Sequence, residues 1–362
     1  MNISKLRDRI AAKAGGTHVS ILSQSEIAAS KEFIPTPAYD LNRIVSGSIH
    51  KGFPNKTFTL FVGPETSGKS SLICLALVEA QRQGYIPVII DTEGGWDTKF
   101  TKRWGMDAEN VIYTYCPFVS KASVILSTII EDEEDKNAKY AIAIDSIGGF
   151  ERLKILDDAR EKKVIKADQG RLQKDIKQML KLALIICKSK NSIGFGAGHY
   201  YGDPSGYGDP EKIGGGKAAK LLPDIIISLK KFKIYENPKA KGKEKGKVLG
   251  TNLKAISLKN RYYPPFGEAD VEINYRSGIN SYAGLIKLAI ESEYIIQNGS
   301  WYTFQNGEKI QGADKIENIL KDDNVYLDFL EKWLESTGYS SVNMEIKEAS
   351  ELIEEAAKEK IK

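Results

Sequence analysis

Short apolar runs alternate with amphipathic segments from about residue 36 to residue 265. The apolar runs have the length and β-branched content of buried strands, and they lie at 58–62, 87–91, 111–115, 140–145, 193–197 and 225–232. Helical spacing occupies the segments between them, at 69–83, 97–104, 119–134 and 170–190. Buried strands that alternate with helices predict an α/β fold, with a mostly parallel sheet covered by helices on both faces.

The beginning of the chain has a different pattern. Residues 3–14 show helical periodicity, with Ile3, Leu6 and Ile10 on one face, and Gly15 and Gly16 end this helix. The following segment, to residue 34, carries only short apolar pieces. This pattern fits a docking arm and a loosely ordered terminus equally well.

The last third of the chain departs from strand–helix alternation. Two apolar runs within 230–259 flank a lysine-rich stretch at 237–247, which predicts a β-hairpin with a basic tip. A solvated tip is the ordinary interpretation, and a DNA contact is the alternative. Residues 268–362 then predict strands at 270–275 and 301–304 and helices near 283–292, 313–336 and 344–360. We therefore expect three parts, which are an N-terminal arm at 1–35, a core at 36–267 and a small α+β domain at 268–362.

Composition narrows the class of protein. The 362 residues are 41% hydrophobic and 28% charged, as in ordinary globular proteins. No apolar run reaches the ~18 residues of a membrane span, and the N-terminus lacks a signal peptide's apolar stretch. We therefore expect a cytoplasmic protein without membrane contact. The three cysteines lack metal-ligand spacing and indicate reduced thiols. A net charge of +4 permits nucleic-acid binding without demonstrating it.

The sharpest chemical signal is a phosphate-binding loop at 63–70. It fits the pattern G-x-x-x-x-G-K-[ST] and lies between an apolar strand and a helix. This context directs backbone N–H groups and the positive end of the helix toward phosphate, with Lys69 on the β- and γ-phosphates and Ser70 on Mg²⁺. The predicted nucleotide contacts are Gly63, Pro64, Glu65, Thr66, Ser67, Gly68, Lys69, Ser70 and Ser71.

Two carboxylates follow predicted strands. Asp145 ends the strand at 140–145, as a Walker B aspartate does, and would help to hold ATP-bound Mg²⁺. The alternative for Asp145 is a helix cap. Glu93 follows the strand at 87–91 and is a candidate base for the attacking water.

An ordered set of motifs resembles RecA-type recombinases over residues 36 to 335. The matching segments are the phosphate loop, Asp91-Thr92-Glu93 with Asp97 and Phe100, Ile144-Asp145-Ser146, Lys259-Asn260-Arg261 with Pro265-Phe266, Tyr275 to Tyr282 and Gly299 to Gly312. The Ser46-Gly47 entry, the early helix and His199 are most similar to the phage UvsX branch. The resemblance implies a RecA-like P-loop ATPase core, a polymerisation arm and a small C-terminal domain.

The resemblance also implies roles around the nucleotide. Glu93 would activate water, Phe100 would stack on adenine, and Asp97 would contact the adenine amino group. Lys259 and Arg261 would reach the nucleotide of the neighbouring subunit, as an arginine finger does. The alternative is that Lys259 and Arg261 are ordinary basic residues of the protein surface.

His199 would sense the γ-phosphate and couple it to the following loop. That glycine-rich loop, 200–217, corresponds to a DNA-binding loop of the family and contains Tyr207, Lys212 and Lys217. The helix at 170–190 would add Lys174 and Lys181, for which a solvated helix face is the alternative.

The resemblance therefore implies a Mg²⁺-dependent, DNA-dependent ATPase that forms helical homo-oligomers on single-stranded DNA. The filament would pair with homologous double-stranded DNA and exchange strands in recombination and repair. A single-strand-binding protein and a loader are further candidate partners, and a phage-encoded chain would act in the host cytoplasm. The alternatives are a hexameric helicase with the same core and a non-catalytic DNA-binding or annealing protein.

Overall fold

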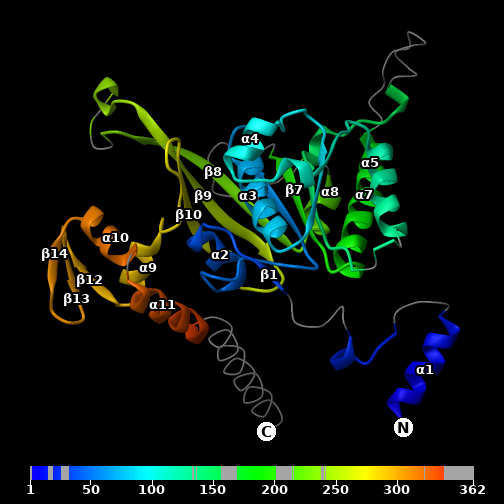
Figure 1. Cartoon of the computed structure of the whole chain (residues 1–362), viewed down its shortest axis with the longest axis horizontal. Coiled ribbons are helices and arrows are strands. Elements are labelled where there is room, and N and C mark those ends of the chain that lie inside the picture. The colour runs from blue at the N-terminus through cyan, green and yellow to red at the C-terminus, as the bar shows by residue number, and fades with distance from the viewer. Residues whose placement is uncertain are drawn as a thin grey trace, which may run out of the picture.

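The computed structural model describes residues 2–14, 19–25, 32–132, 134–135, 137–155, 169–200, 214, 216–237, 240, 242–321 and 323–337. Among these residues, nine strands form one sheet in the order β11-β10-β9-β8-β3-β7-β6-β4-β5 (Figure 1). The strands are β3 (Phe58–Gly63), β4 (Ile86–Asp91), β5 (Ile112–Tyr115), β6 (Tyr140–Asp145), β7 (Ile193–His199), β8 (Ile225–Tyr235), β9 (Val248–Asn260), β10 (Glu268–Asn274) and β11 (Gly278–Asn280). Neighbours from β8 to β5 are parallel, so the predicted mostly parallel sheet is confirmed.

Side-chain alternation along the strands divides the core into two layers. On β6, Ala141 and Ala143 face α3 (Lys69–Arg82), whereas Ile142 and Ile144 face α5 (Val119–Glu131) and α7 (Gln169–Ser189). Successive strand side chains point to opposite faces, so a strand buried on both faces is apolar throughout. The continuous apolar runs in the sequence therefore correspond to strands covered by helices on both sides.

The central strand β7 contains glycines because an aromatic ring fills their space. Phe58 of the neighbouring strand β3 is 1% exposed. A Cβ atom built on Gly194 would lie 2.4 Å from Cδ2 of Phe58, and one on Gly196 would lie 3.1 Å from Cε1 of the same ring. The ring thus packs β3 against β7 near the start of both strands, where Phe58 is in register with Gly194.

The predicted hairpin forms, and it extends the sheet in the antiparallel sense. Strands β8 and β9 pair antiparallel, β10 pairs with β9, and β11 pairs with β10. The sequence predicts that the strand near 270–275 belongs to the C-terminal domain, with a boundary at 267/268. The sheet instead continues to Asn280, because the alternating residues of β10 pack one face onto the main core.

A smaller hydrophobic cluster follows the sheet and includes Ile49 from the N-terminal side of the chain. It is built from α9 (Leu285–Glu291), β12 (Ile295–Asn298), β13 (Trp301–Phe304), β14 (Lys309–Gln311), α10 (Ala313–Lys321) and α11 (Asn324–Thr337). The single helix expected at 313–336 is two helices, because Asp323 accepts the Tyr326 N–H and starts a new one. The helix expected at 344–360 lies outside the described residues.

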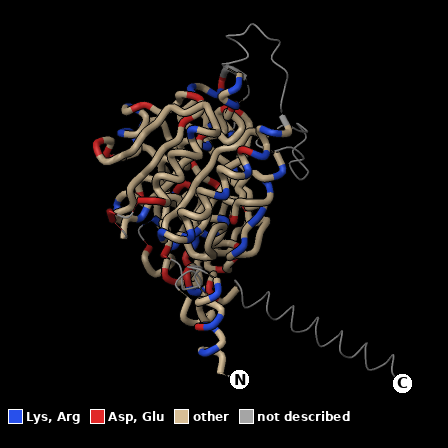
Figure 2. Tube along the Cα trace, turned by 90° about the vertical axis from the view of Figure 1, so that its right-hand side faces the viewer, with Lys and Arg blue, Asp and Glu red and all other residues tan. Residues whose placement is uncertain are grey.

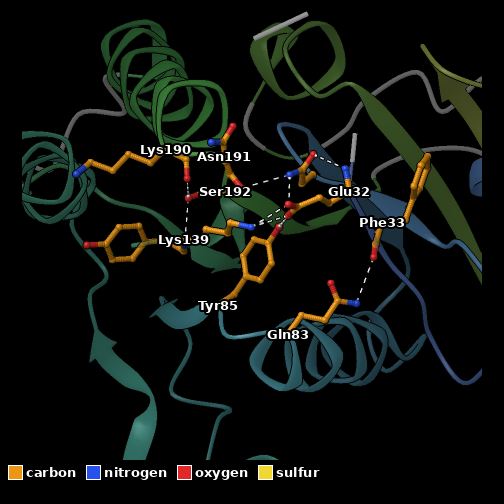
Figure 3. A network of polar contacts seen from close by, with 10 residues as sticks. Glu32, Phe33, Gln83, Tyr85, Lys139, Lys190, Asn191 and Ser192 are labelled. Atoms are coloured by element: carbon orange, nitrogen blue, oxygen red, sulfur yellow. Dashed lines mark hydrogen bonds and ion pairs between the residues drawn. The ribbon is translucent and has the colours of Figure 1, made fainter. Parts of the chain in front are cut away.

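The N-terminal arm leaves the core at a polar anchor. Glu32 accepts hydrogen bonds from Lys139 Nζ at 2.7 Å and from the Tyr85 hydroxyl at 3.1 Å (Figure 3). Next to it, β1 (Phe33–Ile34) pairs with β2 (Phe53–Pro54), and α2 (Tyr39–Ser46) packs on the main core. Earlier in the chain, α1 (Ile3–Lys13) lies apart from the sheet, and none of its described residues is buried (Figure 1). No helix in the described part of the chain is long and apolar enough to cross a membrane.

Candidate nucleotide site

The site lies where the carboxyl ends of the parallel strands meet. Gly63 at the end of β3 is in register with His199 on β7, and Asp91 on β4 is in register with Asp145 on β6. A cavity of about 1570 Å³ opens beside these ends. Ligands of open α/β sheets bind at this edge, outside the carboxyl ends of the strands. The cavity is lined by the predicted loop residues from Pro64 to Ser71, but not by Gly63, and by Glu93, Phe100, Asp145 and His199.

The phosphate loop has the geometry that its glycines predict. Gly68 has φ +85°, and a Cβ atom there would lie 2.5 Å from the Leu253 side chain, so only glycine fits. The next residue, Lys69, starts α3 and is buried, and its Nζ donates to the carbonyls of Gly63 (3.1 Å) and Pro64 (2.7 Å). Burial lowers the pKa of Lys69, and the carboxylates of Asp145 and Glu93 oppose that shift. The ammonium is therefore placed at the cavity wall beside the two acidic groups.

Asp145 and Ser70 lie together, as a shared magnesium site requires. Burial raises the pKa of Asp145, and hydrogen bonds with Ser70 and with the indole of Trp96 counter this rise. Mg²⁺ usually takes one or two protein ligands and completes its shell with water and substrate phosphate. One carboxylate and one hydroxyl at the phosphate loop fit that requirement. No cluster of three or more His, Cys, Asp or Glu ligands exists among the described residues.

Glu93 and His199 form a pair that the sequence did not predict. Nε2 of His199 lies 3.3 Å from Oε1 of Glu93, and the Ser146 hydroxyl donates to the same oxygen at 2.6 Å. Partial burial raises the pKa of Glu93, but hydrogen bonds from Ser146 and His199 and the charge of Lys69 bring it below its ordinary value. The carboxylate is therefore ionised at neutral pH and able to accept a proton from water.

Part of the cavity wall is aromatic. Phe100 lines it and meets the Trp96 ring edge to face, with centroids 5.4 Å apart. Asp97 instead caps α4 (Thr98–Arg103), where its carboxylate accepts the Phe100 N–H at 2.7 Å. It is not among the described lining residues, so a contact of Asp97 with adenine stays a prediction.

Part of the cavity wall is formed by residues that were not among the predicted nucleotide contacts. Tyr275 lies in the turn between β10 and β11 and lines the cavity with the neighbouring residues up to Ile279. The sequence signal was present, because Tyr275 and Gly278 belong to a segment that matches the family pattern. Its position in the same cavity as the phosphate loop depends on the pairing of β10 with β9, which the sequence did not predict.

Lys259 and Arg261 do not line the described cavity of their own chain. Nζ of Lys259 donates to the carbonyls of Leu221 (2.8 Å) and Pro223 (2.6 Å), at the end of α8 (Lys217–Leu221). Arg261 is 56% exposed and lies 3.7 Å from Asp224. A role at a neighbour's nucleotide is compatible with this placement and stays a prediction.

The predicted DNA contacts are only partly within the described residues. Lys174 and Lys181 are exposed on α7, and Lys217 is exposed at the start of α8. Tyr207 and Lys212 lie outside the described residues. Figure 2 shows Lys and Arg positions spread over the core rather than collected in one patch, with several along its right-hand flank.

The sequence of this chain is similar to that of one known protein family. A family model described as the RecA N-terminal domain matches residues 3–280. A protein named Protein RecA from Aquifex aeolicus is 28% identical over 318 residues, which cover 87% of this chain and 86% of the relative. Proteins of the same name from Chlorobaculum parvum and Oleidesulfovibrio alaskensis are each 28% identical, over 75% and 79% of this chain and 74% and 78% of their own lengths. The family match begins in α1 and ends with β11, so it covers the whole sheet and every wall of the cavity.

Proposed function

This chain belongs to the RecA family, and from that premise we infer that it is an ATP-dependent DNA recombinase of homologous recombination and repair. One observation carries this conclusion for the chain itself. The phosphate loop, Glu93, Asp145 and His199 come from separate strands and converge on one cavity. A recombinase needs ATP hydrolysis to alternate between states that hold and release DNA.

We propose that ATP binds with its phosphates on the loop and Lys69, and that Ser70 and Asp145 hold Mg²⁺. When bound, Mg²⁺ neutralises phosphate charge as the γ-phosphate leaves. Glu93 orients the attacking water and takes its proton, while Ser146 and His199 fix the carboxylate from one side. Because His199 contacts Glu93 and immediately precedes the loop that begins at residue 200, it can report the γ-phosphate to that loop.

We propose that the chain acts as a helical homo-oligomer, in which Lys259 and Arg261 complete a neighbour's site. The exposed guanidinium of Arg261 supports this role. The arm supports it too, because α1 exposes Ile3 and Ile10, while β5 at the edge of the described sheet exposes Ile112 and Tyr115. An exposed apolar edge strand is a ready surface for another chain.

We further propose that the filament holds single-stranded DNA through Lys174, Lys181, Tyr207, Lys212 and Lys217, and pairs it with double-stranded DNA. A loader and a single-strand-binding protein are proposed partners, and the cytoplasm is the proposed location. His199 favours assigning the chain to the phage UvsX branch of the family. A protein of that branch would act in the cytoplasm of the host cell.

The test is ATP hydrolysis with and without single-stranded DNA, for the wild type and for Glu93→Gln. We expect DNA to stimulate the wild type, and the substitution to lower kcat by about 10²- to 10⁴-fold while DNA binding persists. Glu109→Gln is the matched control, because Glu109 is exposed in a short helix away from the cavity. Absence of hydrolysis in the wild type would favour a non-catalytic DNA-binding protein, and rings in place of filaments in electron micrographs would favour a helicase.

A further inference from the structure

The Asp145 carboxylate has a hydrogen-bond donor that the family motifs do not include. Nε1 of Trp96 donates to Oδ2 of Asp145 at 2.8 Å. Both side chains are buried, at 7% and 8% exposure. Trp96 belongs to the loop that follows β4, and β4 is the neighbour of the strand that Asp145 ends. The bond therefore connects the loop after β4 to the end of the neighbouring parallel strand β6.

The loop that carries Trp96 is itself fixed by one buried carboxylate. Asp91 is 1% exposed, and its Oδ2 accepts the backbone N–H of Trp96 at 3.1 Å. Its other oxygen accepts the N–H groups of Glu93 (2.9 Å) and Gly94 (2.8 Å). The hydroxyl of Tyr113 on β5 adds a donor to Oδ2 at 3.1 Å. One carboxylate thus sets the position of both the proposed base and the indole.

The indole is held at its other side by an aromatic contact. Phe100 meets it at an interplanar angle of 89°. Edge-to-face contacts of this kind favour one orientation of each ring over others. The backbone of Trp96 is held by Asp91, its indole N–H by Asp145 and its ring by Phe100. The indole therefore has little freedom to turn away from Asp145.

We propose that Trp96 is a positioning residue for the metal-binding carboxylate, a role that rests on the proposed Mg²⁺–ATP chemistry. Each oxygen of a carboxylate can accept two hydrogen bonds, and the carboxylate group can rotate about its Cβ–Cγ bond. The indole N–H engages Oδ2 and so restricts rotation of the carboxylate, which keeps one orientation at the cavity where it would hold Mg²⁺ with Ser70. Partners that orient a metal ligand in this way commonly change metal affinity by about 10- to 100-fold.

The experiment compares Trp96→Phe with the wild type by titrating Mg²⁺ against a fluorescent ATP analogue bound to the full chain. Phenylalanine keeps an aromatic ring against Phe100 and removes the N–H donor. We expect the Mg²⁺ concentration for half-maximal effect to rise about 10- to 100-fold. Affinity for the analogue in EDTA should stay unchanged, because the phosphate loop is intact.

Trp104→Phe is the matched control. Trp104 borders the same cavity, but its Nε1 reaches no acceptor among the described residues. The Mg²⁺ dependence of Trp104→Phe should equal that of the wild type. An unchanged Mg²⁺ dependence in Trp96→Phe would overturn the inference and leave the proposed function standing. Loss of analogue affinity in EDTA would also overturn it, by showing that Trp96 supports the cavity as a whole. A wild type whose binding ignores Mg²⁺ would overturn both.

Discussion

Removing the ring of Phe58 should cost more than an average core truncation. The side chain is 1% exposed and fills the space above Gly194 and Gly196. Truncation of a core phenylalanine to alanine costs about 3–5 kcal/mol, and the cost grows with the cavity that remains. The two glycines have no side chains that could move into the space. We therefore expect Phe58→Ala to lower the free energy of unfolding by about 4–5 kcal/mol.

A double-mutant cycle tests the packing itself. Gly194→Ala alone would place a methyl group 2.4 Å from the ring, and overpacking of this kind costs about 1–3 kcal/mol. In the Phe58→Ala background the same methyl group enters the vacated space. The double variant should therefore be about 2 kcal/mol more stable than the sum of the single losses predicts.

The assay is urea unfolding followed by far-ultraviolet circular dichroism, with equal m-values as the condition for comparing variants. Phe232→Ala is the control, because Phe232 is 52% exposed on β8 and its truncation should cost about 1 kcal/mol or less. Strict additivity of Phe58→Ala and Gly194→Ala would refute the proposed contact between ring and glycines.

Three further predictions concern buried polar groups and thiols. Asn42 is fully buried and hydrogen-bonded to Thr36 and to the Ile49 carbonyl, so Asn42→Ala should cost about 2–4 kcal/mol in urea unfolding. The hydrogen bond from Lys139 lowers the pKa of Glu32, so the stabilisation from this contact is present above the ordinary glutamate pKa of about 4.3 and is lost as pH falls through the lowered pKa. The difference in urea midpoint between wild type and Lys139→Met should therefore shrink as pH is lowered below about 4.3. Burial raises the pKa of Cys74 and Cys187 to about 12, so both thiols should resist iodoacetamide at pH 8 until urea unfolds the chain. For the same reason, the free energy of unfolding should fall as pH rises above the unfolded thiol pKa of about 8.5.

The sequence predicts the strands of the parallel sheet and the phosphate loop well, because both depend on local patterns. The run from Tyr140 to Asp145 is buried along its whole length, as its composition requires. The sequence did not show that the strand at Glu268–Asn274 belongs to the main sheet, because its alternation indicates that one face is buried but not which core buries that face. Only the pairing with β9 decides that question.

Contacts between strand ends could not be predicted for a similar reason. Glu93 and His199 are 106 residues apart, and their contact follows from the order of strands in the sheet. The same applies to Trp96 and Asp145, since a tryptophan after a strand ordinarily indicates packing. Lys259 shows the reverse case, because a family motif indicates a basic residue but not the carbonyl groups that hold it within its own chain.

The separation of α1 from the core has a consequence for the speed and reversibility of assembly. The helix has 11 residues, and isolated helices shorter than about 12–15 residues are marginal in water. Asn2 caps its first turn, but none of its described residues is buried. Any surface that receives α1 must therefore also supply the free energy that orders it. Such a contact is weaker than its area implies, so subunits joined through α1 should require a threshold concentration and should exchange readily at the ends of an oligomer.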